Sequence, residues 1–340
     1  MKNKYAELIS NIKPDQRTQL NSVLIIDGLN TFLRSFTMIN HVNPNGHHIG
    51  GLTGFLKSIG YAIKMLNPTK VVVVFDGIGG SNARKNLYPE YKSNRHVNRM
   101  TNYSIFTSKE EENESINNQM ERLILYLKCL PVSVIGIDGL EADDVIGYLT
   151  YKFENYPDTQ EIFVMSADKD FLQLVSKKTS VYSPMKKIIY TPEKVLEEYG
   201  VSSCNFVNYK VLMGDKSDNI PGVTGLGPVK LLKLFPELAG EKVSLEEIIT
   251  KSVENINENK LYNSVAGFYN QLSINERLIQ LGGEFILPEN KQLIKELFTG
   301  SYGLNKYLFH QLYVNDRLGE SIPNVGQWLN DVFGHLNSLN

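Results

Sequence analysis

Nine acidic residues are the groups in this sequence that are best placed to do chemistry. Each lies where an apolar run ends, where a helix is expected to begin, or in a glycine-containing loop. They are Asp27, Asp76, Glu141, Asp143, Asp144, Asp168, Asp170, Asp215 and Asp218. Carboxylates held together in a cleft cannot all stay ionised without a neutralising cation. Hard oxygen ligands suit Mg²⁺ or Mn²⁺, so the pattern predicts a divalent-metal site if the nine converge.

Short apolar runs predict the sheet that would bring these acids together. Buried strands are expected at residues 23–26, 71–75, 132–135 and 162–165, with a shorter fifth strand at 181–182. Helices are expected at residues 51–65 and 142–153. Continuous apolar strands that alternate with helices favour an α/β fold, in which a mostly parallel sheet is covered on both faces.

Three acids directly follow three of these strands, namely Asp27, Asp76 and Asp168. Ligands of open α/β sheets bind beyond the carboxyl ends of the strands, which is where these side chains are expected. The acids at 141–144 open a helix on the same edge. Taken singly, an Asp-Gly after a strand is often only a turn, and an acid at a helix start is often only a cap. Their joint occurrence favours one metal-binding cleft.

The pattern changes near residue 190. Thr191-Pro192-Glu193 combines an N-cap with proline at the first helical position, and Gly200 is expected to end that helix. The remaining sequence is mostly helical in pattern. We therefore expect an N-terminal extension (1–20), an α/β lobe (21–190) and a helical lobe with a C-terminal extension (191–340).

Composition narrows the class of protein. The 340 residues are 42% hydrophobic and carry a net charge of −2, and without the nine acids the charge would be −2 + 9 = +7. A surface that is basic once metals cover the acids suits nucleic acid. Cys129 and Cys204 form no metal-binding pair, which favours a reducing compartment. The apolar runs are too short to span a membrane, and no signal peptide is expected, so the cytoplasm is the predicted location.

A basic segment follows the second strand. Arg84, Lys85, Lys92, Arg95 and Arg99 are interleaved with tyrosines and a leucine, a mixture that suits a phosphate backbone and a stacked base. The alternative is a solvated basic loop. Lys92 and Arg84 are the candidates to stabilise charge on a transferring phosphate. The polar stretch at 108–118, which precedes an amphipathic helix near 123–130, is expected to be mobile.

A G-x-x-G-x-G string, made by Gly222, Gly225 and Gly227, precedes an apolar helix at 229–235. We interpret it as a tight turn between two helices, whose backbone N–H groups can hold a DNA phosphate without reading sequence. Lys230 is a further DNA-binding candidate in this helix. Glycines also simply make turns. The string is not the dinucleotide-binding pattern, so a nicotinamide enzyme is disfavoured.

Several longer strings resemble the structure-specific 5′ nucleases, which include the flap endonucleases and the 5′→3′ exonuclease domains of bacterial DNA polymerase I. The resemblance rests on residues 26–28 (IDG), 74–77 (VFDG), 91–95 (YKSNR), 139–144 (GLEADD), 166–170 (SADKD) and 213–223 (MGDKSDNIPGV). It covers roughly residues 21–240 and continues weakly to about 290. Size and the absence of a polymerase part make the chain similar to stand-alone phage members such as the T-even ribonuclease H.

The resemblance implies a PIN-like lobe, a helix–three-turn–helix DNA-binding lobe, and a helical arch at about 95–125. It implies two Mg²⁺ ions, replaceable by Mn²⁺, with a possible K⁺ ion at the glycine string. The first ion would be held by Asp27, Asp76, Glu141, Asp143 and Asp144, and the second by Asp168, Asp170, Asp215 and Asp218. Arg84 and Lys92 would approach the scissile phosphate, and Tyr91 would stack near the 5′ end, with Arg95 and Arg99 also contacting DNA.

The expected function is a metal-dependent 5′→3′ exonuclease or flap endonuclease that removes primers in replication. Its expected partners are DNA with a 5′ flap, nick or RNA primer, and single-stranded DNA-binding or other replication proteins. A monomer is expected, in the host cytoplasm if a phage encodes it. The alternatives are a PIN-type single-strand endoribonuclease and an inactive DNA-junction binder. The stretch at 290–340 is expected to pack on the core or to dock a replication partner.

Overall fold

A computed structural model describes residues 21–96, 100–300 and 302–339. The expected N-terminal extension and Arg99 lie outside the described residues. No helix in the described part of the chain is both long and apolar enough to cross a membrane.

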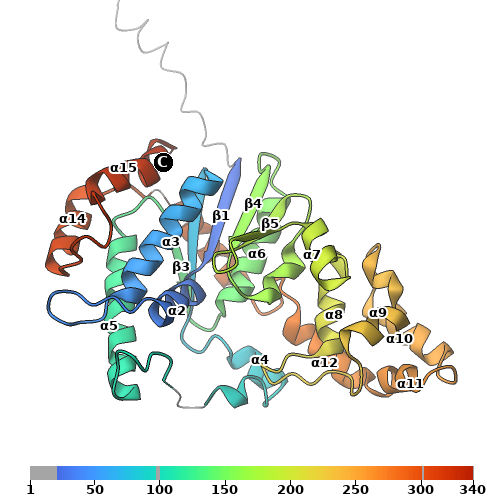
Figure 1. Ribbon diagram of the computed structural model, residues 1–340. Helices are drawn as coiled ribbons and strands as arrows, with labels where there is room; N and C mark the ends of the chain where they lie inside the picture. Colours follow the sequence, from blue (N-terminus) through green and yellow to red (C-terminus); the bar gives the residue numbers. More distant parts are fainter. Residues whose placement is uncertain (1–20, 97–99, 301, 340) are drawn as a thin grey trace, which may run out of the picture.

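A six-stranded sheet forms the centre of the molecule (Figure 1), and its strand order is β3-β2-β1-β4-β5-β6. Its strands are β1 (Ser22–Asp27), β2 (Lys70–Asp76), β3 (Ser133–Ile137), β4 (Glu161–Met165), β5 (Thr179–Ser183) and β6 (Ile188–Tyr190). The first five strands are parallel, and β6 pairs antiparallel with β5. The predicted α/β fold is confirmed; β6 is an addition that the sequence did not indicate.

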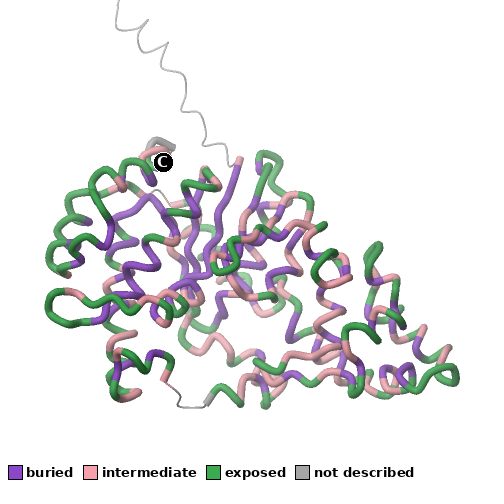
Figure 2. Tube along the Cα trace, in the orientation of Figure 1, coloured by how far each residue is buried: buried purple, intermediate pink, exposed green. Residues whose placement is uncertain are grey.

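Both faces of the sheet are buried, as Figure 2 shows. Alternate residues of β1 point to opposite sides, so that Val23 and Ile25 enter one core and Leu24 and Ile26 enter the other. The second core is covered by α2 (Gly28–Met38), α3 (Gly50–Leu66) and α5 (Lys109–Leu127). The first is covered by α6 (Ala142–Glu154) and continues into the helical lobe.

The helical lobe lies on the α6 side of the sheet (Figure 1), and its apolar residues are part of the first core. It comprises α7 (Pro192–Tyr199), α8 (Phe206–Met213), α9 (Pro228–Leu234), α10 (Leu245–Glu254), α11 (Lys260–Gly267) and α12 (Tyr269–Ile279). Helix α7 begins after the Thr191 cap and ends at Gly200, whose φ of 72° is left-handed, as predicted. The prediction of a tight turn between two helices is wrong, because residues 214–227 form a long loop between α8 and α9.

The polar stretch at 108–118 is helical, which corrects the expectation of mobility. Ser108 caps α5 by accepting from the Glu111 backbone N–H. Glu112, which is fully buried, accepts from the backbone N–H groups of Thr101 and Asn102. Acidic residues in a first turn also stabilise the N-terminus of a helix. The polar residues that suggested a mobile segment are therefore the ones that cap α5 and stabilise its first turn.

The C-terminal stretch packs on the core, which was the first of the two expected alternatives. Helix α13 (Pro288–Thr299) contacts β3, while α14 (Lys306–Asn315) and α15 (Val325–Leu339) lie against the α3 side. Trp328 packs so closely on α3 that a Cβ atom at Gly60 would lie 2.8 Å from its ring. Helices α14 and α15 thus complete the second core, whereas α13 adds Ile294 to the first.

Candidate active site

Asp27 is held at the centre of the sheet edge. It ends β1 and caps α2, where its Oδ1 accepts from the Asn30 backbone N–H at 3.1 Å. Its Oδ2 accepts from Ser166 Oγ at 2.9 Å, and that hydroxyl in turn accepts from the Asp168 N–H at 3.0 Å. Strand β1 is flanked by β2 on one side and by β4 on the other. The order in which the chain adds strands therefore reverses direction at β1. Such a switch point is where open α/β sheets bind ligands.

Asp76 holds the start of α6, which carries the next group of acidic residues. It is exposed at the end of β2, and its Oδ1 accepts from the Ala142 N–H, the first residue of α6, at 2.9 Å. This bond fixes the start of α6, where the carboxylate-bearing residues Glu141, Asp143 and Asp144 lie. The acids of β1, β2, β4 and α6 therefore share one edge, as the sequence predicted.

Several of these carboxylates resist ionisation, mainly because they are buried and in part because their charges repel one another. Burial, with added repulsion from Asp76 and Asp168, raises the pKa of Asp27 to about 7. Burial also raises the pKa of Asp143 well above its usual value, and the charges of Asp27 and Asp168 add to the effect. No cation forms an ion pair with Asp27, Asp143 or Asp168 among the described residues. A nearby positive ion would relieve this repulsion.

Arg84 lies beneath this cleft. It belongs to α4 (Asn82–Leu87) and is only 2% exposed. Its guanidinium donates to both oxygens of Asp144 at 2.6 and 2.8 Å, to Glu141 at 2.8 Å and to the Leu278 carbonyl at 2.9 Å. Although burial opposes its charge, these two carboxylates raise the pKa of Arg84. Arg84 thus positions Asp144 and Glu141; Arg84 and Asp144 are both buried, and the roles that the resemblance implied for them stay a prediction.

Lys92 is the cation that borders the cleft. Its Nζ lies 2.6 Å from Glu141 Oε1, its side chain is partly exposed, and its φ of 55° places the backbone in the left-handed region. Despite its burial, Glu141 has a lowered pKa because Lys92 and Arg84 stabilise its charge. Tyr91 is only 3% exposed and donates to Glu141 at 3.1 Å. In this structure it is therefore not available to stack on a base.

The second acidic group is held by another lysine, which the sequence analysis did not single out. Lys210 of α8 lies 2.6 Å from Asp170 and also pairs with Asp215. Burial, with repulsion from Asp168, raises the pKa of Asp170 to about 6 against the opposing charge of Lys210. Asp218 pairs instead with Arg95. The signal for Lys210 was its place in the last turn of α8, five residues before Asp215.

The loop at 215–220 is tied to the basic segment. The Lys92 N–H donates to the Asp218 carbonyl at 2.8 Å, and Asn94 donates to the Lys216 carbonyl at 2.7 Å. Asn219 donates back to the Glu90 carbonyl at 2.9 Å. These bonds join the helical lobe to the α/β lobe beside the cleft, so the two acidic groups are held in one frame.

The donor set fits hard divalent cations, because it is made of carboxylate oxygens that repel one another. Among the described residues, however, no three carboxylates converge in the geometry that would hold a metal. Four cationic side chains occupy several of the acids instead: Arg84, Lys92, Arg95 and Lys210. The prediction of nine ligands around two ions therefore remains a prediction, although the structure does bring the acids of strands β1, β2 and β4 together.

The glycines of the predicted DNA-binding loop have different roles. A Cβ at Gly222 would lie 2.1 Å from the Met213 carbonyl, so close packing requires glycine there. Gly225 has a φ of 80°, and Gly227 is the residue before α9, with open space around its Cα. Lys230 is exposed and donates to the Gly225 carbonyl at 3.0 Å.

The fold and the acidic edge define a two-lobed α/β protein whose second lobe is helical and whose acids lie at a sheet switch point. Two family models match the chain in succession: the 5′-3′ exonuclease N-terminal resolvase-like domain at residues 22–200 and the 5′-3′ exonuclease C-terminal SAM fold at residues 201–295. The chain belongs to the 5′-3′ exonuclease family.

Curated relatives agree with this assignment. The chain is 33% identical to the 5′-3′ exonuclease of Buchnera aphidicola subsp. Schizaphis graminum over 236 residues, which cover 68% of this chain and 76% of the relative. It is 34% identical to the 5′-3′ exonuclease of Bacillus subtilis over 64% of this chain and 70% of that one. DNA polymerase I of Bacillus subtilis is 31% identical over 70% of this chain, which is 26% of the polymerase.

Solved structures share the fold. The bacteriophage T5 D15 flap endonuclease, in a complex with DNA and metal ions, has a TM-score of 0.65 at 22% identity and covers 82% of this chain and 100% of its own. Human GEN1, in complex with Holliday junction DNA, has a TM-score of 0.55 at 15% identity and covers 98% of this chain and 77% of its own.

Proposed function

We propose that this nuclease is a metal-dependent 5′→3′ exonuclease and flap endonuclease, which cleaves phosphodiester bonds near 5′ ends and removes RNA primers during replication. The observation that carries the proposal is the cluster of mutually repelling acids at the switch point, with Lys92 at its border. The T5 D15 flap endonuclease, which shares the fold, was solved with DNA and metal ions. Mg²⁺ is the proposed ion, with Mn²⁺ as a substitute.

Each part of the cleft has a proposed role. The first ion, which is the reactive one, would be held by Asp27, Asp76, Glu141, Asp143 and Asp144, and the second by Asp168, Asp170, Asp215 and Asp218. Such an ion supplies a water of lowered pKa and charge stabilisation at the phosphate. Lys92 would contact the scissile phosphate, since its partly exposed ammonium borders the cleft. Arg84 would act indirectly, because its buried guanidinium fixes Glu141.

DNA would lie along both lobes. The loop around Gly225 and Gly227, together with the exposed Lys230, would hold duplex backbone, and a K⁺ ion at this loop is part of the proposal. Arg95 would reach phosphate from the basic segment, because it is exposed and its partner Asp218 is a proposed metal ligand. We also propose a monomer in a reducing cytoplasm that works with single-stranded DNA-binding protein; two free cysteines support the compartment.

Cleavage of a 5′-labelled flap and of a nicked duplex tests this proposal. Mg²⁺ should support cleavage, EDTA should abolish it, and Asp143→Asn should lower kcat/KM by about 100-fold or more while the protein stays folded. Asp158→Asn is the matched control, because Asp158 is an exposed acid in a turn away from the cleft. Mapped product lengths would separate stepwise 5′ digestion from cleavage at the flap junction.

Four outcomes would contradict the proposal. Full cleavage in EDTA would rule out the metal, and unchanged cleavage by Asp143→Asn would rule out the cleft. Cleavage of single-stranded RNA alone would favour an endoribonuclease. Tight flap binding without turnover in Mg²⁺ or Mn²⁺ would favour a junction-binding protein.

A further inference from the structure

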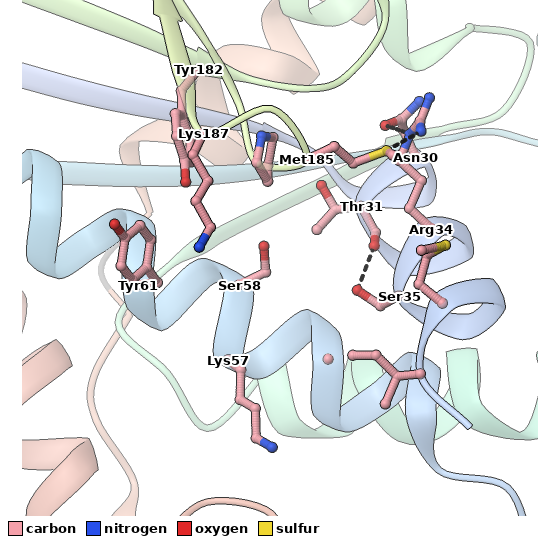
Figure 3. A pocket seen from close by; sticks show the side chains of 14 residues that line it. Asn30, Thr31, Arg34, Ser35, Lys57, Ser58, Tyr61, Tyr182, Met185 and Lys187 are labelled. Atoms are coloured by element: carbon pink, nitrogen blue, oxygen red, sulfur yellow. Dashed lines mark hydrogen bonds between the residues drawn. The ribbon is translucent and has the colours of Figure 1, made fainter. Parts of the chain in front are cut away.

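A pocket with a volume of about 340 Å³ lies beside the acidic cleft but outside it. Its walls come from α2, from α3 and from the turn between β5 and β6, as Figure 3 shows. Its size is at the lower end of the range of about 300–1,000 Å³ that is typical of small-molecule sites. The pocket is therefore large enough for one compact ligand.

The charge of this pocket is positive. Arg34, Lys57 and Lys187 line it, and no aspartate or glutamate does so among the described residues. Lys187 extends from the β5–β6 turn toward Ser58 of α3 (Figure 3). In the part of the chain that the structure describes, neither Lys57 nor Lys187 has an ion-pair partner. Two ammonium groups without an ion-pair partner, on different walls of one pocket, favour an anionic ligand, although Lys57 points away from Lys187 (Figure 3).

A buried threonine hydroxyl in the wall of this pocket lacks a hydrogen-bond partner. Thr31 lines the pocket from α2, is only 5% exposed, and its Oγ1 has no hydrogen-bond partner. An unsatisfied buried hydroxyl costs free energy unless a ligand or water completes it. The Thr31 oxygen is itself shielded from solvent, so it adds polarity beneath the pocket wall, and the contacts for a ligand come from the exposed cations.

The walls also present aromatic and apolar surface. Tyr61 is 55% exposed on α3, and Met185 is 55% exposed on the β5–β6 turn. A tyrosine ring and a thioether can both pack against the face of a nucleobase. A bare phosphate would leave this surface unused, whereas a nucleotide would use both the cations and the ring.

One residue joins this pocket to the acidic cleft. The Asn30 N–H donates to Asp27, while Asn30 Oδ1 accepts from Arg34 Nε at 3.1 Å and from the Ala167 N–H at 3.3 Å. Asn30 also lines the pocket. A ligand in the pocket therefore lies next to the site where strands would be cut, without touching the acids.

The geometry points to a second nucleotide site: the pocket binds a nucleoside monophosphate, with its phosphate at the exposed lysines Lys57 and Lys187 and its base against Tyr61 or Met185. Two sources have this chemistry. One is the free mononucleotide that an exonuclease releases, and the other is a nucleotide that belongs to a bound strand. The inference goes beyond the proposed function, because binding here requires neither metal nor cleavage.

The test measures binding of 5′-dAMP to the full-length protein in EDTA by equilibrium dialysis. The wild type should bind it more tightly than inorganic phosphate or deoxyadenosine. The double variant Lys57→Ala/Lys187→Ala should bind dAMP about tenfold more weakly or worse, because two charge-assisted contacts are lost. Lys64→Ala is the matched control on α3: it removes the same charge outside the pocket, from a half-exposed 3.7 Å pair with Asp331. Both replaced lysines are exposed, so folding should be unaffected.

A second arm identifies the source. Affinity for a nicked duplex is measured in EDTA with the same variants. If the double variant loses duplex affinity together with dAMP affinity, the ligand is part of a strand; if only dAMP affinity falls, it is the free product. Failure of the wild type to bind dAMP at millimolar concentration would overturn the inference, and so would equal dAMP binding by the double variant. Neither failure would affect metal-dependent cleavage, which is assayed separately.

Discussion

Replacing Arg84 by methionine tests whether this residue supports the cleft from below or contacts the substrate. Arg84 and its partners Glu141 and Asp144 are all almost fully buried, with side chains 2%, 5% and 2% exposed. Methionine keeps much of the side-chain volume and removes every donor. The substitution leaves Asp144 with no cation and Glu141 with Lys92 alone.

The expected cost is large because buried charges would lose their partner. Breaking a buried ion pair by removing one member destabilises a protein by about 3–5 kcal/mol. Arg84 makes three charge-assisted contacts at 2.6–2.8 Å and one hydrogen bond to the Leu278 carbonyl. We therefore expect Arg84→Met to lower the free energy of unfolding by about 3–5 kcal/mol.

Urea unfolding at neutral pH measures this loss, with Lys85→Met as the control. Lys85 is the next residue in α4 and pairs with no acid among the described residues, so its change should stay within about 0.5 kcal/mol. Adding Asp144→Asn to Arg84→Met should recover about 2 kcal/mol, because the unpaired charge is gone. A loss below about 1 kcal/mol, or no recovery in the double variant, would refute this reasoning. Normal stability with greatly reduced cleavage would instead place Arg84 at the phosphate.

Two further predictions concern pH and packing. The folded protein retains a proton on Asp27 that the unfolded chain has already lost, since burial raises the pKa from 3.8 to about 7. In EDTA, stability should therefore fall as pH rises from about 4 to about 7, and Asp27→Asn should reduce that fall by about 2–4 kcal/mol in urea titrations; an unchanged slope would contradict it. Gly60→Ala should destabilise the protein by about 1–2 kcal/mol and shift the fluorescence of the single tryptophan, because the new Cβ would lie 2.8 Å from the Trp328 ring. Gly334→Ala, with open space around it in α15, should be neutral or stabilising, and equal effects of the two changes would argue against the packing.

The sheet was predictable because its signals are local. Strands β1, β2 and β4 each contain a continuous apolar run, and the acids at or just after their ends mark where the strands stop. Strand β6 escaped prediction because it has only three residues and pairs through a turn that contains the left-handed Lys187. The start of α5 was missed because its polar composition also suits a mobile segment.

The interior of the site was less predictable, because it depends on contacts between distant residues. The burial of Arg84 depends on Leu278, which lies 194 positions away. Nothing in the basic segment indicates which of its cations is covered and which borders the cleft. The sequence likewise does not indicate that Tyr91 is buried. It was expected to stack near the 5′ end of DNA, whereas its hydroxyl donates a hydrogen bond to Glu141 inside the protein.

The long-range bond between Arg84 and the Leu278 carbonyl has a consequence for the newly made chain. Ribosomes add about 5–20 residues per second, so the 194 positions between these partners represent about 10–40 s of synthesis. During that time the α/β lobe can fold, but Arg84 lacks one of its acceptors, and Lys92 waits for the carbonyl of Asp218. We expect the cleft to become fully ordered only late in translation. A growing chain would then pose little threat to the nucleic acids around it until the helical lobe has emerged.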